Sequence, residues 1–411
     1  MNYRPLGVTV FSFALIVLLA LPQPTYGQSS NGPLLKGQGR GDVIPGKFIV
    51  VLKAGASPRV VAARHGVTPD MVYSAALNGF AGAFPAARVE KLLQDSQVDF
   101  IEEDQVMTIG AQILPAGINR IDAELNATVV AARTTGGVNV DIAIIDTGID
   151  LTHPELNVVK NVSFVNGAKT GNDDHGHGTH CAGIAAARDN NIGVVGVAPG
   201  ARLWAVKVLD RNGSGTNSNV IRGVDYVTAN AASIEVANMS LGGGNSDALN
   251  LAISNSVAKG VVYAVAAGNS AVDAANSSPA NSPDVLCVSA MVDTDGMPGH
   301  LGAATSYGAD DTFASFSNFG AVVDIAAPGV NVYSTYKGGA YATMSGTSMA
   351  SPHVTGAVGL YLATHAKPTN ATGVAAVRQA IINAALPQGG TSGFTGDPDS
   401  TKEPLLYGKN L

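Results

Sequence analysis

Between residues 140 and 267, short apolar runs alternate with longer segments of helical character. Helical segments are expected at residues 178–188, 218–229 and 247–258. Four runs are apolar over nearly their whole length, as strands buried on both faces of a sheet are: Val140–Ile145, Leu203–Leu209, Val236–Leu241 and Val261–Ala267. Because strands and helices alternate at this spacing, the sequence predicts a three-layer α/β/α fold with a mainly parallel sheet.

Polar residues follow three of these predicted strands. Asp146, Ser240 and Asn269 each come at or just after the end of an apolar run. Ligands of open parallel sheets bind outside the carboxyl ends of the strands. We therefore expect a functional site at this edge of the sheet.

Ser348 lies between small residues and opens a long apolar run that extends from Met349 to Leu362. A serine at the start of a helix has a free backbone N–H and the positive end of the helix dipole beside it, and both favour an oxygen that gains negative charge. The alternative is an N-cap serine on a buried helix. The catalytic interpretation requires a base and an orienting acid elsewhere in the chain.

Asp146 follows a buried strand, where an unpaired carboxylate is costly, so we expect it to have a partner. The candidate partners lie in the segment Asp173–His180, which contains His175, His177 and His180. These histidines follow an H-x-H-x-x-H pattern, which a metal-dependent hydrolase could use as ligands. A metal site would leave Ser348 unexplained.

The composition and the N-terminal residues indicate which partners the protein can bind and whether it is exported. The formal net charge of −7 gives no basic surface for nucleic acid. An apolar run after Arg4 predicts a secretory signal peptide over residues 1–27, followed by a polar linker over residues 28–45. No later run is long and apolar enough to span a membrane, so we expect an exported protein that is free of the membrane once the signal is removed.

Residues 46–110 carry a separate pattern. Strands are expected at 47–53, 78–84 and 98–104, and helices at 57–65 and 86–94. The order βαββ or βαβαβ over about 60 residues is typical of a small ferredoxin-like α+β unit.

The motifs resemble those of subtilisin-like serine proteases, and of their proteinase K-like branch in particular. The chain order Asp146, His177, Ser348 is the order of that family, and the segments His177–Gly183, Val236–Gly244 and Ala266–Ala280 are similar to it. Residues 46–110 resemble its inhibitor I9-type propeptide, through segments such as Ile49–Lys53 and Ile101–Asp104. The resemblance implies a peptidase domain over 111–411. It also implies a propeptide that acts as intramolecular chaperone and inhibitor and is cut off between Met107 and Gln112.

The resemblance assigns roles to four residues. Ser348 would attack a peptide carbonyl, His177 would act as general base and acid, and Asp146 would orient the imidazole. The oxyanion would be held by the Ser348 backbone N–H and the Asn269 side chain. The expected product is a monomeric, secreted endopeptidase made as a zymogen and acting on proteins and peptides. The rival from another class is a catalytically silent binding protein on the same scaffold.

Glycine-rich runs are expected to hold an extended substrate by main-chain hydrogen bonds. The first specificity pocket would be walled by residues 241–243 and 266–268, which carry no charge, so broad cleavage with a preference for apolar or aromatic residues is expected. The candidate substrate-binding residues are Gly213, Ser214, Gly215, Ser240, Leu241, Gly242, Gly243, Ala266, Ala267 and Gly268.

Calcium is the expected structural ion, because carboxylates and carbonyls suit a hard cation. By resemblance, Asp324 and the carbonyls of Pro283 and Val285 form one site. Glu155, with Asp189 and Asn191, is similar to a second site of the family. The loop 291–313 contains four aspartates, which are either ligands of another ion or solvated surface acids: Asp293, Asp295, Asp310 and Asp311.

The chain has two cysteines, Cys181 and Cys287. Relatives in the proteinase K-like branch often carry disulfides. Cys181 is expected to be a buried free thiol, and a Cys181–Cys287 bridge is the alternative.

Overall fold

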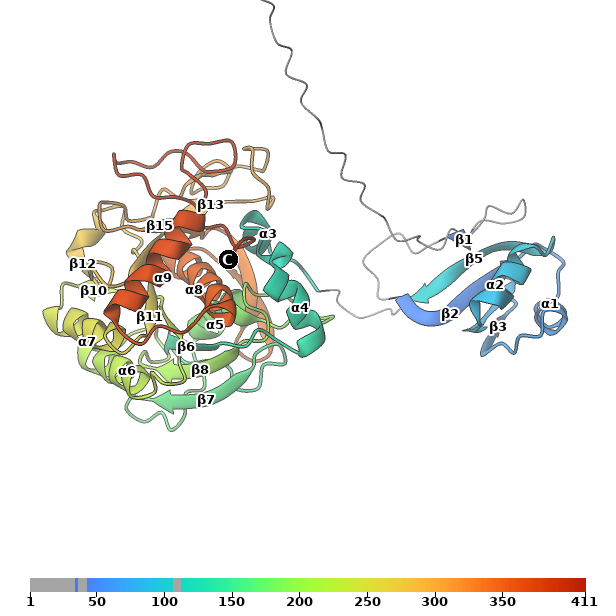
Figure 1. The fold of residues 1–411 in the computed structure, drawn as a ribbon, viewed down its shortest axis with the longest axis horizontal. Helices are drawn as coiled ribbons and strands as arrows, with labels where there is room; N and C mark the ends of the chain where they lie inside the picture. Colours follow the sequence, from blue (N-terminus) through green and yellow to red (C-terminus); the bar gives the residue numbers. More distant parts are fainter. Residues whose placement is uncertain (1–33, 36–42, 106–111) are drawn as a thin grey trace, which may run out of the picture. The chain divides into compact units, whose positions relative to one another are not determined.

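The computed structural model describes residues 34–35, 43–105 and 112–411. The chain divides into two compact units, Met1–Met107 and Thr108–Leu411, and Figure 1 shows the elements of each. The predicted signal peptide, most of the predicted linker and most of the predicted cleavage segment lie outside the described residues.

The smaller unit is a five-stranded sheet with two helices. Its elements are β1 (Leu34–Leu35), β2 (Val43–Leu52), α1 (Pro58–Arg64), β3 (Met71–Tyr73), β4 (Gly79–Ala83), α2 (Ala86–Leu93) and β5 (Val98–Gln105). The sheet order is β1-β5-β2-β4-β3, and β2 is antiparallel to both of its neighbours. Side chains of both helices, including Val61 and Leu92, share one core with Val50, Phe80 and Ile101 of the sheet.

The ferredoxin-like expectation is confirmed, but neither predicted element order was right. From β2 to β5 the order is βαββαβ. The missed strand β3 has three residues, none of them buried, so it lacks the apolar alternation by which strands are recognised. The predicted linker also contributes β1 and the start of β2 to the sheet.

The larger unit is built on a mainly parallel sheet of order β14-β13-β11-β9-β6-β8-β7, with β15 also paired to β13. Its strands are β6 (Asp141–Asp146), β7 (Val158–Ser163), β8 (Arg202–Lys207), β9 (Val236–Met239), β11 (Val262–Ala266), β13 (Leu286–Val292), β14 (Thr312–Phe313) and β15 (Ile325–Pro328). Two smaller antiparallel pairs are β10 (Gly243–Gly244) with β12 (Ser277–Ser278), and β16 (Val332–Tyr336) with β17 (Ala340–Met344).

Helices cover both faces of this sheet, which confirms the predicted three layers. The helices are α3 (Ala116–Arg120), α4 (Ala127–Thr135), α5 (His177–Ala186), α6 (Asn217–Ala229), α7 (Asp247–Val257), α8 (Thr347–Thr364) and α9 (Ala371–Ala384), with 3-10 turns at Ala123–Leu125 and Ala274–Asn276. Gly359 of α8 approaches Ile142, whereas Gly223 of α6 approaches Ile145. Residues of opposite parity on one strand point to opposite faces, so α8 and α6 lie on opposite sides of β6.

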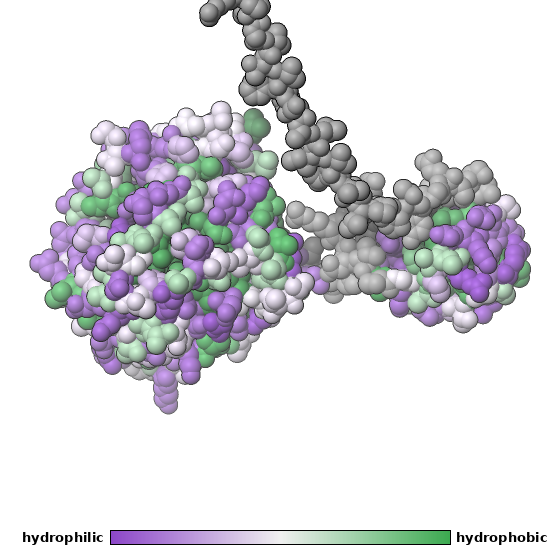
Figure 2. Space-filling model, in the orientation of Figure 1, coloured by the Kyte–Doolittle hydropathy of each residue, from purple (hydrophilic) through white to green (hydrophobic). Residues whose placement is uncertain are grey.

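Helix α8 is almost entirely buried and contacts β9, β11, β13 and β15 (Figure 1). Its burial on all sides explains why the run after Ser348 is predominantly apolar and why the polar residues within it, Ser351, His353 and Thr355, are buried too. The outer surface of the larger unit intersperses hydrophilic and hydrophobic residues on the face shown in Figure 2. Among the described residues, no helix has the length and apolar character needed to cross a membrane.

Candidate active site

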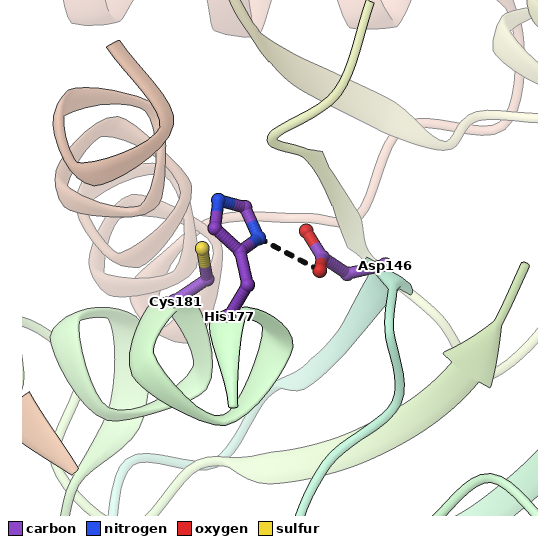
Figure 3. A group of neighbouring side chains, drawn as sticks. All are labelled: Asp146, His177 and Cys181. Carbon is purple, nitrogen blue, oxygen red and sulfur yellow. Dashed lines mark hydrogen bonds and ion pairs between the residues drawn. The ribbon is translucent and has the colours of Figure 1, made fainter. Parts of the chain in front are cut away.

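Asp146 ends β6 and its side chain is fully buried. Its Oδ1 accepts hydrogen bonds from the Thr147 backbone N–H, at 2.7 Å, and from Nδ1 of His177, at 2.8 Å (Figure 3). The other ring nitrogen of His177 faces away from Asp146. The carboxylate therefore fixes which imidazole nitrogen is left for other partners.

Local structure brings His177, the first residue of α5, to this position. Asp173 accepts hydrogen bonds from the backbone N–H groups of His175, Gly176 and Thr179, which holds the turn before the helix. Gly178 has no side chain, and a Cβ there would lie 2.1 Å from the Gly148 carbonyl. The close approach of α5 to the end of β6 thus requires glycine at this position.

The environment of His177 has opposing effects on its pKa. Burial lowers the pKa of the imidazole, but the charge of Asp146 and the hydrogen bond to it outweigh burial, so the pKa is raised above its ordinary value. The Asp146 carboxylate therefore stabilises the protonated, positively charged form of the His177 ring.

Ser348 is the second residue of α8, and a helix leaves the N–H groups of its first turn without intrahelical acceptors. The Ser348 hydroxyl donates to the Ser240 carbonyl at 3.3 Å, and the Ser348 carbonyl accepts from Ser240 Oγ at 2.8 Å. The Cys181 thiol donates to the same Ser348 carbonyl at 3.4 Å. The Cys181 sulfur also lies within 4.8 Å of a carboxylate oxygen of Asp146 and a ring nitrogen of His177 (Figure 3), so it links this pair to the backbone of Ser348.

Asn269 follows β11 and is oriented by Thr347. Its Oδ1 accepts from the Thr347 backbone N–H at 2.8 Å and from the Thr347 hydroxyl at 2.9 Å. The same hydroxyl accepts from the Gly268 N–H at 3.1 Å. With Oδ1 held in this way, the amide NH₂ of Asn269 is left to bind an acceptor beside Ser348.

The sequence did not predict the residues that support Ser240 and Ser348. Asn238, fully buried on β9, donates to Ser240 Oγ and accepts from the hydroxyls of Ser351 and Thr355. A buried asparagine in an apolar strand was the available signal, since such a group needs partners. Lys207 is also fully buried, and its ammonium donates to the Thr147 carbonyl and to Asp174.

The three histidines of Asp173–His180 do not converge. His180 is fully buried, and its Nε2 faces the carbonyls of Val332 and Ala342. Burial lowers its pKa to about 4. Neither His175 nor His180 belongs to a group of side chains close enough to share an ion in the described part of the chain. The alternative of a histidine metal site is therefore not supported by the geometry.

Two cavities adjoin the cluster, and the predicted substrate-binding residues line them. One has a volume of about 510 Å³, and its lining includes His177, residues 213–215 and residues 240–243. The other has a volume of about 460 Å³, and its lining includes Ser348, Asn269, residues 241–244 and residues 266–268. Neither lining includes Asp, Glu, Lys or Arg, so neither favours a charged substrate side chain.

The predicted calcium ligands around Asp324 are used differently. Arg378 of α9 donates to the Pro283 carbonyl at 2.6 Å and to both Asp324 oxygens at 3.3 and 3.4 Å. The three predicted ligands are Pro283, Val285 and Asp324. The Arg378 guanidinium already supplies positive charge to two of them, Pro283 and Asp324. These residues do not fit a calcium ion while Arg378 is in place.

Glu155 fits a cation better. It is fully buried, its Oε1 accepts from the Val194 N–H at 3.0 Å, and its Oε2 receives no well-formed hydrogen bond from the described residues. Burial raises the pKa of Glu155 to about 7, although Tyr341 and Val194 oppose the rise. Gln112 binds the Arg188 and Val194 carbonyls beside it.

The other residues predicted at that site lie differently. Asp189, expected as a ligand with Asn191, instead pairs with Arg133 at 2.7 Å.

The cysteines are as expected: Cys181 and Cys287 are both buried and free. Burial raises the pKa of each thiol well above its ordinary value.

Comparisons with known proteins agree with this geometry. The subtilase family matches residues 137–403, and the peptidase inhibitor I9 family matches residues 47–110. The chain is 39% identical over 355 residues to an alkaline serine protease of Corniculantispora psalliotae, covering 84% of this chain and 86% of that protein. It is 36% identical over 409 residues to a cuticle-degrading protease of Metarhizium anisopliae, covering 96% and 97%.

Two further similarities concern subtilisins. Subtilisin NAT of Bacillus subtilis subsp. natto is 40% identical over 300 residues, covering 72% of this chain and 73% of that protein. The crystal structure of a cold adapted subtilisin-like serine proteinase superposes with a TM-score of 0.58 and 33% identity, covering 74% of this chain and all of that one.

Proposed function

The chain belongs to the subtilase family and is a subtilisin-like serine protease with an I9 propeptide, and we propose that Asp146, His177 and Ser348 are its catalytic triad. The observation that carries this assignment is the 2.8 Å hydrogen bond from His177 Nδ1 to a fully buried Asp146, with Cys181 next to both this pair and the Ser348 carbonyl at the start of α8. The bond leaves His177 Nε2 to exchange protons.

In the proposed reaction, Ser348 Oγ leaves the Ser240 carbonyl and attacks the substrate carbonyl carbon, while His177 Nε2 takes the hydroxyl proton. The charge on the former carbonyl oxygen is held by the Ser348 N–H and the Asn269 NH₂. The C–N bond then breaks as His177 returns the proton to the leaving amine. Water releases the acyl group by the reverse proton path, and Asp146 stabilises the imidazolium in both halves.

The substrate is proposed to be an extended polypeptide with apolar or aromatic side chains near the cut. The uncharged linings of the two cavities support this specificity, and so do the glycine-rich segments 213–215 and 241–243 in the lining of one of them, since glycine lets a substrate main chain approach closely. The domain limits, with a signal peptide over 1–27 and a propeptide over 46–110, are part of the same proposal. Export and self-inhibition by the propeptide complete it.

Calcium is proposed to bind at Glu155, where the buried Oε2 and the Arg188 and Val194 carbonyls supply oxygen ligands. Its contribution would be structural, since it would neutralise a buried carboxylate away from the reacting atoms.

The test is to express residues 28–411 as the parent chain, as Ser348→Ala and as a control, Ser233→Ala, in which an exposed serine is changed. Chain mass and casein hydrolysis are then measured. The parent and Ser233→Ala should lose about 80 residues and cut casein, whereas Ser348→Ala should stay at full length without activity. Casein hydrolysis by Ser348→Ala would overturn the assignment of the nucleophile. Uncut, inactive parent protein would favour the silent scaffold.

A further inference from the structure

The loop 293–311 between β13 and β14 buries acidic groups that the proposed protease reaction does not use. Asp293, Asp310 and Asp311 are 3%, 2% and 0% exposed, whereas Asp295 is exposed. The alternative that these are solvated surface acids is therefore wrong for three of the four. Carboxylates taken out of water need a compensating charge or hydrogen bonds.

Among the described residues, a positively charged side chain fully compensates only one of these buried carboxylates, that of Asp311. Arg120 of α3, itself buried, binds Asp311 at 2.7 Å and also donates to the carbonyls of Ser392 and Gly393. Its Nε lies 3.9 Å from Asp293 Oδ1. His300, in the same loop, has its Nδ1 hydrogen-bonded to the Asp310 carbonyl.

The three remaining acids face one another. Asp293, Asp295 and Asp310 each offer a carboxylate oxygen, and these oxygens all lie within 4.8 Å of one another. Oxygens bound to one Ca²⁺ at roughly 2.3–2.6 Å are at most about 5 Å apart. The spread of the three oxygens therefore suits one shared ion.

The second observation is an oxygen without a partner. Asp293 Oδ1 accepts from the Gly296 N–H at 3.1 Å, but Oδ2 is buried and no hydrogen bond from the described residues reaches it. Asp310, by contrast, accepts from the Thr294 N–H and the Gly302 N–H, one on each oxygen. A buried, unpaired carboxylate oxygen beside two further carboxylates is expected where a cation binds.

We propose that Asp293, Asp295 and Asp310 form a binding site for a divalent cation, calcium by its ligand chemistry, which fixes the loop 293–311. Exposed Asp295 provides the route of entry from solvent. Burial raises the pKa of Asp293 to about 7, with Arg120 opposing the rise, and a bound cation would keep this carboxylate ionised. The site is separate from Glu155 and independent of the protease assignment.

The test uses residues 28–411 carrying Ser348→Ala, so that the chain is not digested, at pH 8. Bound ⁴⁵Ca²⁺ is measured by equilibrium dialysis for this parent and for Asp293→Asn and Asp295→Asn. The matched control is Asp225→Asn, which removes an exposed carboxylate of α6. Glu155→Gln identifies calcium held at the other site. Hydrogen exchange of peptides from 291–313 is followed with and without calcium.

Each loop variant should bind one calcium equivalent fewer than the parent, and Asp225→Asn should bind the same number. Calcium should slow exchange in 291–313 in the parent and in Glu155→Gln, but not in Asp295→Asn. Asp295→Asn changes an exposed residue, so it remains informative if Asp293→Asn does not fold. Unchanged calcium binding in Asp295→Asn, with loop exchange indifferent to calcium in the parent, would overturn the proposal.

Discussion

Replacing Glu155 with glutamine should change the stability of the larger unit in opposite directions with and without calcium. The carboxyl group has an ordinary pKa of 4.5, and burial raises it to about 7 in the folded protein. A difference of this size corresponds to on the order of 3 kcal/mol of unfolding free energy. Glu155→Gln keeps the shape of the side chain and removes the titrating group.

The direction follows from the raised pKa. The folded protein binds the proton more tightly than the unfolded chain, so the destabilising effect is absent below about pH 4.5. It develops as the pH rises and is complete above pH 7. In EDTA at pH 8, Glu155→Gln should therefore melt several degrees above the parent, since about 1 kcal/mol corresponds to roughly 2–4 °C in domains of this size. At pH 4.5 the two should melt together.

Calcium should reverse the order at pH 8. The ion would bind the ionised Glu155 of the parent and raise its melting temperature, whereas Glu155→Gln would gain less. The assay is thermal unfolding of the Ser348→Ala chain, which avoids self-digestion, with Asp225→Asn as the charge-removal control. Equal destabilisation by Glu155→Gln at both pH values in EDTA, or an undiminished calcium effect in the variant, would refute the reasoning.

Two further predictions concern the active site. Asp146→Asn should lower kcat by roughly 10⁴-fold. It should also move the acidic limb of the kcat/KM profile to lower pH, because burial lowers the pKa of His177 and only the smaller effect of Asp173 is then left to oppose it. A limb that stays in place on a chromogenic peptide would contradict this. Thr347→Val removes one of the two hydrogen bonds that orient Asn269. Because a hydrogen bond contributes about 1 kcal/mol, the variant should have a kcat reduced about tenfold or less and an unchanged KM. A kcat equal to that of the parent would show that the hydrogen bond from the Thr347 backbone N–H is enough to orient Asn269.

The sequence predicted four of the strands that are buried on both faces, but it missed β13 and β15, which are buried along their whole length. The runs that became β6, β8, β9 and β11 are nearly continuous in apolar residues, and a parallel sheet between helices is the usual way to bury them. Strand β7 was missed because it lies at the edge of the sheet, where only one neighbour and partial burial leave the pattern weak. The hairpin of β16 and β17 was missed for the same reason, since β17 has no fully buried residue.

The candidate site was predictable in residue type but not in its contacts. The positions of Asp146 and Asn269 after strands, and of Ser348 at a helix start, follow from local patterns. The hydrogen bonds that orient these groups join residues far apart in the chain, such as Thr347 with Asn269 and Ser240 with Ser348. The periodicity of a local segment carries no information about such pairs, so the residues that support the site could be identified only from the three-dimensional structure.

The region around Asp324 shows how a distant residue can change the role of a local motif. The expected ligands Pro283 and Asp324 are present, but α9 brings the Arg378 guanidinium against both of them. A guanidinium carries a permanent charge and several donors, so it can satisfy a carboxylate and a carbonyl that would otherwise require an ion. At Glu155 and in the loop 293–311, by contrast, a buried carboxylate oxygen has no well-formed hydrogen bond. The need for calcium is therefore better inferred from buried carboxylate oxygens that receive no well-formed hydrogen bond from the described residues than from the presence of family ligands alone.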